Sequence, residues 1–211
     1  MKGILGLLRM SSRNNKPQQE HSDSVFFSTA FANQGVDPAM LVPWEARAGE
    51  VGAKRLPASK GGKLLQALWS KDKYMAHLDQ DAVRRMENFF EFAQVPPNRD
   101  LIRQDEYGNF MIVLLSGTIA VDRLQPWGEQ LRLAETRPGD ILGEMSLLDS
   151  GIRFSACTTL TDCEIAVLSA EGMDDMMVKD PQLAASLVAL LARKLSLRLR
   201  AVSARLSENQ K

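Results

Sequence analysis

Apolar residues are sparse and irregularly spaced over the first 62 positions of the chain. They are interrupted by a polar run at residues 11–20 and by Pro38, Pro43 and Pro57. Such a segment buries too little apolar surface to offset the entropy that is lost on ordering. We therefore predict that residues 1–62 form an N-terminal arm that is largely extended or disordered. Its aromatic side chains, which would pack onto the domain or a partner, are Phe26, Phe27, Phe31 and Trp44.

A helical spacing of apolar residues follows the arm, with Leu65 and Trp69 on one face of a predicted helix. The spacing returns over residues 83–90, and the two prolines at 96–97 end this helical stretch. We therefore expect ordered structure over residues 63–211, in a single domain.

Beyond these prolines the apolar period changes from that of helices to that of strands. Short β-prone stretches alternate with turn sequences such as Gly108-Asn109 and Pro138-Gly139-Asp140. Many short strands at close intervals predict a small antiparallel barrel or sandwich. The predicted strands comprise residues 101–102, 110–115, 118–121, 130–133, 141–142, 154–159 and 164–168.

A long helix is predicted over residues 181–207, because Pro181 suits a first helical turn and leucines repeat along one side. This helix is too long for a small barrel to cover, so we expect it to pair with a second copy of itself in a homodimer. Its arginines lie mostly off the apolar stripe and are typical of a solvated face. The stripe consists of Leu183, Leu187, Leu191, Leu195, Val202 and Leu206.

The charge balance and the cysteines narrow the class of protein. The 26 basic and 26 acidic side chains cancel, so no global field attracts nucleic acid or anionic lipid, and any anion site must be built locally. Cys157 and Cys163 are expected to be reduced, buried residues of a cytosolic protein. Together with the distant His21 and His77 they match no familiar zinc pattern, so we predict no metal site.

The hydropathy of the chain predicts neither a membrane span nor a signal peptide. No stretch approaches the ~20 apolar residues that a spanning helix needs. The apolar run at residues 4–8 is broken by Arg9, and no small-residue cleavage site follows it. We therefore predict a cytoplasmic protein.

A candidate binding site lies between two predicted strands, at residues 143–153. Gly143 precedes Glu144 at the start of a single helical turn, and Arg153 follows nine residues after that carboxylate. A helix start offers free N–H groups to an anion, and an arginine adds a bidentate clamp for phosphate. A neighbouring carboxylate repels a bare phosphate but accepts a hydrogen bond from a sugar hydroxyl. The pair therefore indicates a ribose phosphate; the alternative is a plain salt bridge between Glu144 and Arg153.

Several motifs around this site resemble, in order, the cyclic nucleotide-binding domain family of the catabolite activator protein and the regulatory subunits of cyclic-AMP-dependent kinase. The resemblance runs over residues 97–163 and includes LSGTIAV at 115–121, RPGDILGEMSLL at 137–148 and RFSACTTLTDC at 153–163. The spacing from glutamate to arginine is that of the kinase subunits. The implied fold is mainly β with flanking helices, an antiparallel β-roll (a double-stranded jelly-roll barrel) with a long C-terminal helix.

The resemblance also implies a role for each residue of the site. Glu144 would hold the ribose 2′-hydroxyl, and Arg153 would hold the cyclic phosphate of cAMP or cGMP. Gly143 would allow close approach, and the amides of Met145 and Ser155 would add contacts. Because the site contains neither a nucleophile–base pair nor a metal cluster, we expect a ligand but no cofactor and no enzyme activity.

Four positions depart from the family pattern. Phe154 occupies the place of a small residue that touches the phosphate, and an inward-pointing phenylalanine would crowd it. Arg198 and Leu199 stand where activator-type receptors place Thr-Ser against adenine. Arg198 could instead donate to guanine O6 and N7, as arginine does in groove recognition. Asp105 replaces a turn glycine before the first long strand.

Two functions remain open from the sequence. The first is a sensing module, in which nucleotide bound between barrel and long helix shifts that helix and signals to an effector protein. The second is an interaction or scaffold protein that keeps the barrel but no longer binds nucleotide; Phe154 and Arg198 favour it, whereas Glu144 and Arg153 oppose it. A transcription factor is not expected, because only residues 207–211 follow the last helical leucine and a DNA-binding domain needs several tens more.

Overall fold

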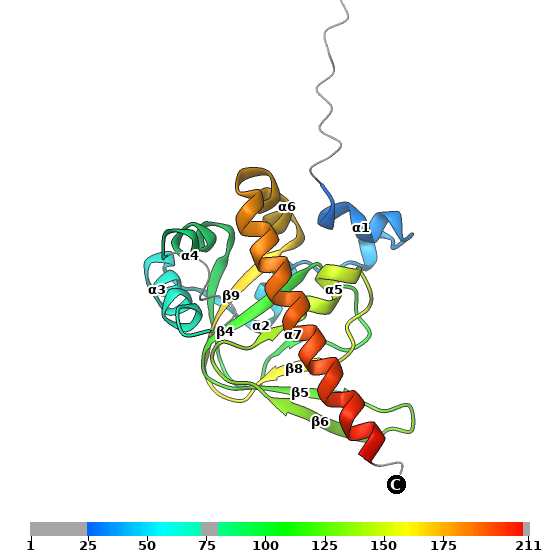
Figure 1. Cartoon of the computed structure of the whole chain (residues 1–211). Coiled ribbons are helices and arrows are strands. Elements are labelled where there is room, and N and C mark those ends of the chain that lie inside the picture. The colour runs from blue at the N-terminus through cyan, green and yellow to red at the C-terminus, as the bar shows by residue number, and fades with distance from the viewer. Residues whose placement is uncertain (1–24, 73–79, 209–211) are drawn as a thin grey trace, which may run out of the picture.

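Two antiparallel sheets form the centre of the protein and together make a β-roll (Figure 1). The computed structural model describes residues 25–72 and 80–208. The strands are β1 (Lys54–Arg55), β2 (Glu91–Val95), β3 (Asp100–Ile102), β4 (Phe110–Ser116), β5 (Ile119–Leu124), β6 (Gln130–Glu135), β7 (Ile141–Leu142), β8 (Ala156–Thr159) and β9 (Cys163–Ser169). One sheet has the order β1-β2-β9-β4-β7 and the other β3-β8-β5-β6. The predicted fold class is confirmed.

Helices flank the roll, and the longest of them crosses it (Figure 1). They are α1 (Phe27–Asn33), α2 (Trp44–Val51), α3 (Ala58–Trp69), α4 (Gln80–Met86), α5 (Glu144–Asp149), α6 (Ala170–Lys179) and α7 (Pro181–Glu208). Two short 3₁₀ turns, η1 (Pro38–Met40) and η2 (Glu87–Phe89), complete the described elements.

Strand β4 lies at the junction of two apolar cores. Successive side chains of a strand point to opposite faces, and β4 buries both of its faces. Met111 and Val113 join the core shared with the helices, whereas Ile112 and Leu114 face the interior between the sheets. The following turn needs Gly117, which has φ 92° and whose missing β-carbon would collide with the carbonyl of Asp162. This glycine turn was among those expected from the resemblance.

The helical stretch that was predicted to reach residues 96–97 ends earlier than expected. Helix α4 passes into η2, and β2 follows, pairing with β9 along its whole length. A short, mostly apolar stretch such as residues 92–95 fits a helix or a strand equally well. Pairing with β9, more than sixty residues later in the chain, therefore decides its conformation.

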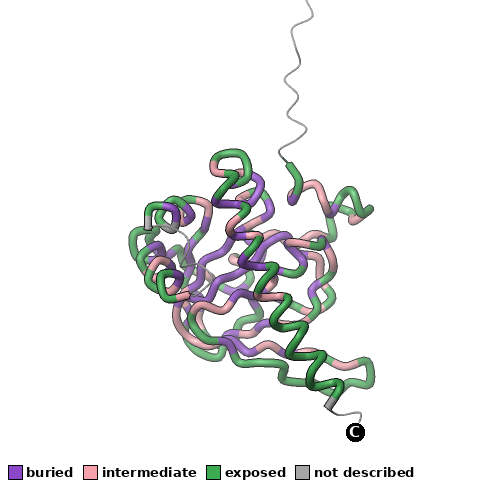
Figure 2. The backbone as a smooth tube through the Cα atoms, viewed as in Figure 1, coloured by how far each residue is buried: buried purple, intermediate pink, exposed green. Residues whose placement is uncertain are grey.

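The segment before the roll differs from the extended arm that its composition predicts. Residues 25–62 contain α1, α2, β1 and the start of α3, so a helix crosses the predicted boundary at residue 62. Phe27, Phe31 and Trp44 are buried, as their predicted packing on the domain required, whereas Phe26 is 64% exposed. Burial is greatest at the centre of the molecule, and the second half of α7 is exposed (Figure 2). Such short helices depend on tertiary packing of one apolar face, which composition averaged over 62 residues does not reveal. The rest of the predicted arm, residues 1–24, lies outside the described residues.

A buried aspartate of α6 attaches α1 to the rest of the fold. Asp174 accepts hydrogen bonds from the backbone N–H groups of Phe26 (2.9 Å), Phe27 (2.8 Å) and Ser28 (2.9 Å), and from the Ser28 hydroxyl (2.7 Å). The first N–H groups of a helix have no partner within the helix. The Asp174 carboxylate supplies that partner from a helix far away in the chain.

Removing this carboxylate should detach α1. We expect Asp174→Ala to lower the free energy of unfolding by about 2–3 kcal/mol, because one buried donor and three partly buried donors lose their acceptor at once. Urea unfolding followed by circular dichroism measures the change. The matched control is Asp175→Ala, which removes only a surface ion pair to Lys179 and should cost less than about 1 kcal/mol. Equal effects of the two substitutions would contradict a specific role for Asp174.

The apolar stripe of α7 divides into a buried and an uncovered half. The helix covers the predicted span and ends at Glu208. Leu187 and Leu191 in its first half are fully buried in the core shared with the other helices. Farther along, Val202 is 51% exposed and Leu206 is 61% exposed. Only the second half of the stripe is therefore free to pack against another surface.

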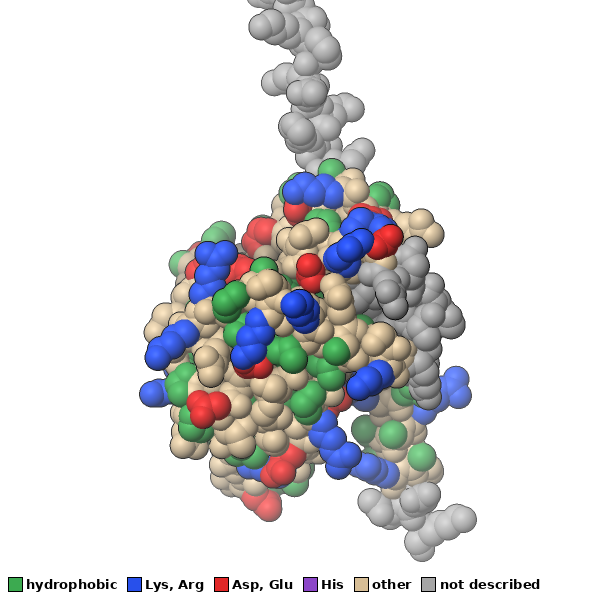
Figure 3. All heavy atoms as spheres, turned by 90° about the vertical axis from the view of Figure 1, so that its left-hand side faces the viewer, with side chains coloured by type: hydrophobic (Ala, Val, Ile, Leu, Met, Phe, Trp, Pro, Cys, Tyr) green, Lys and Arg blue, Asp and Glu red, His purple; other side chains and the backbone are tan. Residues whose placement is uncertain are grey.

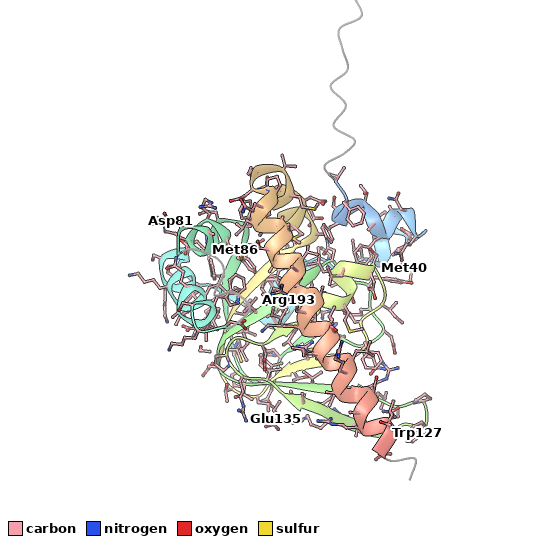
Figure 4. All side chains as sticks on the ribbon, viewed as in Figure 1. Met40, Asp81, Met86, Trp127, Glu135 and Arg193 are labelled. Carbon is pink, nitrogen blue, oxygen red and sulfur yellow. The ribbon has the colours of Figure 1, made fainter. Side chains whose placement is uncertain are left out.

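Basic and acidic side chains are interspersed over the face shown in Figure 3, as expected from the balanced charge of the chain. Arg193 on α7 and Asp81 on α4 illustrate this: both are exposed at the surface (Figure 4). Among the described residues, no helix combines the length and the apolar character needed to cross a membrane.

Candidate functional site

The predicted site forms around the turn between β7 and α5. Gly143 at this turn has φ 75°, a left-handed conformation that glycine adopts without strain. A β-carbon at Gly143 would lie 2.6 Å from Nη1 of Arg153, and one at Gly108 would lie 2.8 Å from Nε of the same guanidinium. The two glycines therefore make the space that the Arg153 side chain occupies.

Arg153 is held inside the roll rather than at its surface. The residue is 3% exposed, and its Nη1 and Nη2 donate to the carbonyl oxygens of Gly143 (2.8 Å) and Phe110 (2.7 Å). Its guanidinium carbon lies 4.7 Å from the centre of the Phe110 ring, which is a cation–π contact. Burial lowers the pKa of Arg153 to about 10, because desolvation disfavours the charged form.

The charge of Arg153 lacks a carboxylate partner. Within the described part of the chain, no aspartate or glutamate forms an ion pair with its guanidinium. The alternative of a direct salt bridge between Glu144 and Arg153 is therefore not what the structure shows. A buried cation bonded only to carbonyl groups is costly, and an anionic ligand would offset that cost.

Glu144 is buried beside the same turn and is paired with the long helix instead. The residue is 4% exposed, and its Oε1 accepts a hydrogen bond from Nη1 of Arg198 on α7. The other terminal nitrogen of Arg198 donates to the carbonyl oxygen of Ile141 (3.1 Å). The structure thus brings Glu144 and Arg198 together, and it places Arg198 on the predicted ribose-binding residue rather than beside an open base site.

The other predicted site residues lie around this centre. The Phe154 side chain is half exposed, so it does not fill the interior next to Arg153. Arg123 of β5 lies over its ring at 4.1 Å and also donates to its carbonyl oxygen. The Met145 side chain is exposed on α5, and Ser155 is half-buried directly before β8.

Sequence reasoning did not find Phe110 or Arg47 as neighbours of Arg153. Phe110 was only a strand residue in the apolar pattern, and no local motif marks its carbonyl as an acceptor. The burial of Arg47 could have been predicted from the sequence, because Arg47 lies three residues after Trp44 and four before Val51, on the apolar face of α2. Asp105 has φ 65°, so it holds the left-handed position at which the family has glycine.

The cysteines are free and buried. Burial raises the pKa of the Cys157 thiol to about 12, so this residue stays protonated and unreactive at neutral pH. Among residues 25–72 and 80–208, no cluster of three or more His, Cys, Asp or Glu could hold a metal ion. His21 and His77 lie outside the described residues.

Comparison with known proteins identifies the fold that carries this site. The family model of the cyclic nucleotide-binding domain matches residues 92–180, which include Arg153, its two carbonyl partners Gly143 and Phe110, and the whole of α5. Residues 92–180 belong to the cyclic nucleotide-binding domain family. The recognition made from the sequence motifs is thereby confirmed.

Relatives of this cyclic nucleotide-binding domain include regulators of transcription. The chain is similar to the cyclic AMP receptor protein of Thermus thermophilus, with 32% identity over 108 residues that cover 51% of this chain and 50% of the relative. It is also similar to a CRP-like cAMP-activated global transcriptional regulator of Mycobacterium tuberculosis, with 24% identity over 118 residues that cover 56% of this chain and 53% of the relative. The chain thus spans about half the length of the curated relatives that it matches.

Solved structures show the same fold. A cyclic nucleotide-binding domain from Methylobacillus flagellatus superposes with a TM-score of 0.67 and 23% identity, covering 72% of this chain and 86% of that one. The catabolite activator protein of Thermus thermophilus gives a TM-score of 0.54 and 29% identity, covering 63% of each chain. The β-roll with its flanking helices is therefore the common architecture.

Proposed function

We propose that this protein is a non-catalytic receptor for a cyclic mononucleotide, cAMP or cGMP, that signals through its C-terminal helix to a partner protein. The observation that carries the proposal is the buried guanidinium of Arg153, which is bonded to two carbonyl oxygens and has no carboxylate partner among the described residues. A cyclic phosphate supplies one negative charge and acceptor oxygens, which are what this cation needs. The carboxylate of Glu144, which is buried at the same turn, suits a ribose hydroxyl.

Isothermal titration calorimetry with cAMP, cGMP and cyclic di-GMP tests the proposal. We expect one of the two mononucleotides to bind at one site per chain. The matching linear nucleoside 5′-monophosphate should bind more weakly. Its phosphate carries close to two negative charges instead of one, so the Glu144 carboxylate repels it more strongly, and it lacks the compact cyclic ring. Absence of heat with all of these ligands, in protein that melts cooperatively, would contradict a receptor.

The ion pair between Glu144 and Arg198 supports a mechanism by which ligand binding changes the position of α7. A ribose hydroxyl can use the Glu144 carboxylate fully only after Arg198 releases it. Because Arg198 belongs to α7, occupied and empty sites differ in how the long helix is held. A ligand shifts an equilibrium through such differential contacts. We propose that Arg198, once released, donates to the base of the bound nucleotide.

Substituting Arg198 tests its role toward the base. We expect Arg198→Thr to retain binding of the cyclic phosphate but to lower the ratio of cGMP to cAMP affinity by about 10-fold, the effect of one bidentate contact to guanine O6 and N7. Competition titrations with the two nucleotides measure the ratio. Arg200→Thr is the matched control, since Arg200 is an exposed arginine two positions away on α7 and should leave the ratio unchanged. An unchanged ratio in Arg198→Thr would show that Arg198 does not contact the base.

An interaction or scaffold protein that no longer binds nucleotide is the second candidate. The observation that favours it is the same Arg198, which already occupies Glu144 from within the chain. This candidate predicts that titration with cyclic nucleotides gives no heat and that Arg198→Thr lowers the stability of the fold. The receptor and the scaffold are therefore separated by the experiments above.

A further inference from the structure

Helix α2 brings a second buried arginine close to the site. Arg47 is 1% exposed, and its Nη1 donates to Oε2 of Glu50 (2.7 Å) while its Nη2 is paired with the carboxylate of Glu106. Arg103 reaches the same two carboxylates from the surface, at 3.2 Å from Glu50 and 3.6 Å from Glu106. Two arginines and two glutamates thus balance one another in a single network. We call these four residues the Arg47 network.

Glu106 is the link between this network and the phosphate-binding residue. Its carbonyl oxygen accepts a hydrogen bond from the backbone N–H of Arg153 (2.8 Å), and the N–H of Asp105 donates to the carbonyl of Arg153 (2.9 Å). Backbone hydrogen bonds therefore hold residues 105–106 directly beside Arg153. Burial is the main cause of the lowered pKa of Arg153, but the charge of Arg47 lowers it further and the charge of Glu106 raises it.

The balance of charges around Arg153 follows from these contacts. Arg198 neutralises Glu144, and Arg47 with Arg103 neutralises Glu50 and Glu106. The guanidinium of Arg153 is the buried cation that remains without an anion among the described residues.

Burying the arginine at position 47 of α2 costs free energy, because its charge loses contact with water. The Nε of Arg47 has no hydrogen-bond partner among the described residues, so its burial is incompletely compensated. Methionine would fill a similar volume, and replacing buried ion pairs by apolar residues is often neutral or stabilising. Packing alone therefore does not account for an arginine here.

We propose that Arg47 is a positioning residue of the nucleotide site: by holding the Glu106 carboxylate, it keeps that carboxylate off the guanidinium of Arg153, which stays available for the phosphate of the ligand. This inference rests on the proposed function. It also gives a task to α2, which lies outside residues 92–180 of the matched domain. Without Arg47, the Glu106 side chain pairs with Arg153 and competes with the ligand.

Binding measurements on variants of the full chain test this role. We expect Arg47→Met to weaken cyclic nucleotide binding by about 10-fold or more, because the ligand must then displace a charged hydrogen-bond partner. The double variant Arg47→Met with Glu106→Gln should return to within about twofold of the wild-type affinity, since the competing charge is gone. Arg55→Met is the matched control, because Arg55 is an exposed arginine outside the Arg47 network and its removal should leave the affinity unchanged.

The double variant separates a positioning role from a structural one. If Arg47 only supported the fold, removing Glu106 as well would leave affinity as low as in Arg47→Met or lower it further, and that result overturns the proposal. Thermal unfolding of each variant shows that the compared proteins are folded.

A second measurement needs no nucleotide and keeps this inference distinct from the proposed function. Urea midpoints are compared for Glu106→Gln, Arg153→Met and their combination, in the wild-type and in the Arg47→Met background. We expect a weak coupling between Glu106 and Arg153 in the wild type and a clearly stronger one in Arg47→Met, because the Glu106 carboxylate pairs directly with Arg153 only when Arg47 is absent. Equal coupling in the two backgrounds overturns the role of Arg47. Failure of the wild type to bind any cyclic nucleotide overturns the receptor instead.

Discussion

Replacing Arg153 by methionine is expected to weaken cyclic nucleotide binding by more than about 30-fold, the loss typical when one member of a desolvated charge pair is truncated. Methionine keeps much of the apolar stem but supplies neither charge nor donors. Arg153 is bonded to two carbonyl oxygens and stacked on Phe110, with its pKa lowered by burial. The charge is thus unfavourable in the folded protein, and a bound anion would offset its cost. Calorimetric titration with the preferred cyclic nucleotide measures the loss.

Two further variants sharpen this test. Arg153→Lys retains the charge without the planar fork, so we expect affinity between those of the wild type and Arg153→Met. Arg137→Met removes an exposed arginine that lies just before the same turn and should leave affinity unchanged.

The thermal stability of Arg153→Met separates the two candidate functions. A wild type that binds no nucleotide, together with a melting temperature lowered by many degrees in Arg153→Met, would identify Arg153 as a structural residue and favour the scaffold.

Placing a charge in the uncovered half of the α7 stripe is expected to convert a homodimer into a monomer. Leu199, Val202 and Leu206 are exposed and follow the alternating spacing of three and four residues that parallel helix pairs use. In the proposed dimer, glutamates at position 202 of the two chains would lie opposite one another between the helices, where two like charges would be partly desolvated. We expect wild-type protein to have the mass of two chains in light scattering and Val202→Glu to have the mass of one.

The matched control for the dimer carries the same substitution elsewhere. Val178 on α6 is exposed to a similar extent as Val202, so Val178→Glu should leave the mass of the dimer unchanged. A two-chain mass for Val202→Glu would place the interface on another surface. A one-chain mass for the wild type would mean that the second half of α7 packs against a different partner.

Local signals in the sequence determined most of the domain. The continuous apolar run at 110–115 marks a strand buried on both faces, and Ser116-Gly117 marks the turn that follows it. Pro181 and the leucine repeat marked the start and the length of α7. The spacing of Glu144 and Arg153 likewise brought both residues to one turn. Each of these features depends on residues close together in the chain, so it is visible without the fold.

Other features were decided by contacts between distant parts of the chain. Arg198 meets Glu144 across 54 positions, and the carbonyl of Phe110 meets Arg153 across 43. Helices α1 and α2 form although their composition is typical of an extended arm. Asp174 accepts hydrogen bonds at the start of α1, and both helices bury apolar side chains against the rest of the protein.

The sequence by itself determined the roll, the long helix and the residues that gather at the candidate site, because periodicity, turn chemistry and motif spacing are local. Only the tertiary structure decided which charges meet there. An arginine can pair with a carboxylate, a carbonyl or a ligand, and the choice depends on burial and on neighbours that the chain supplies from afar. The unpaired charge of Arg153, the pairing of Arg198 and the position of Arg47 are all consequences of that choice.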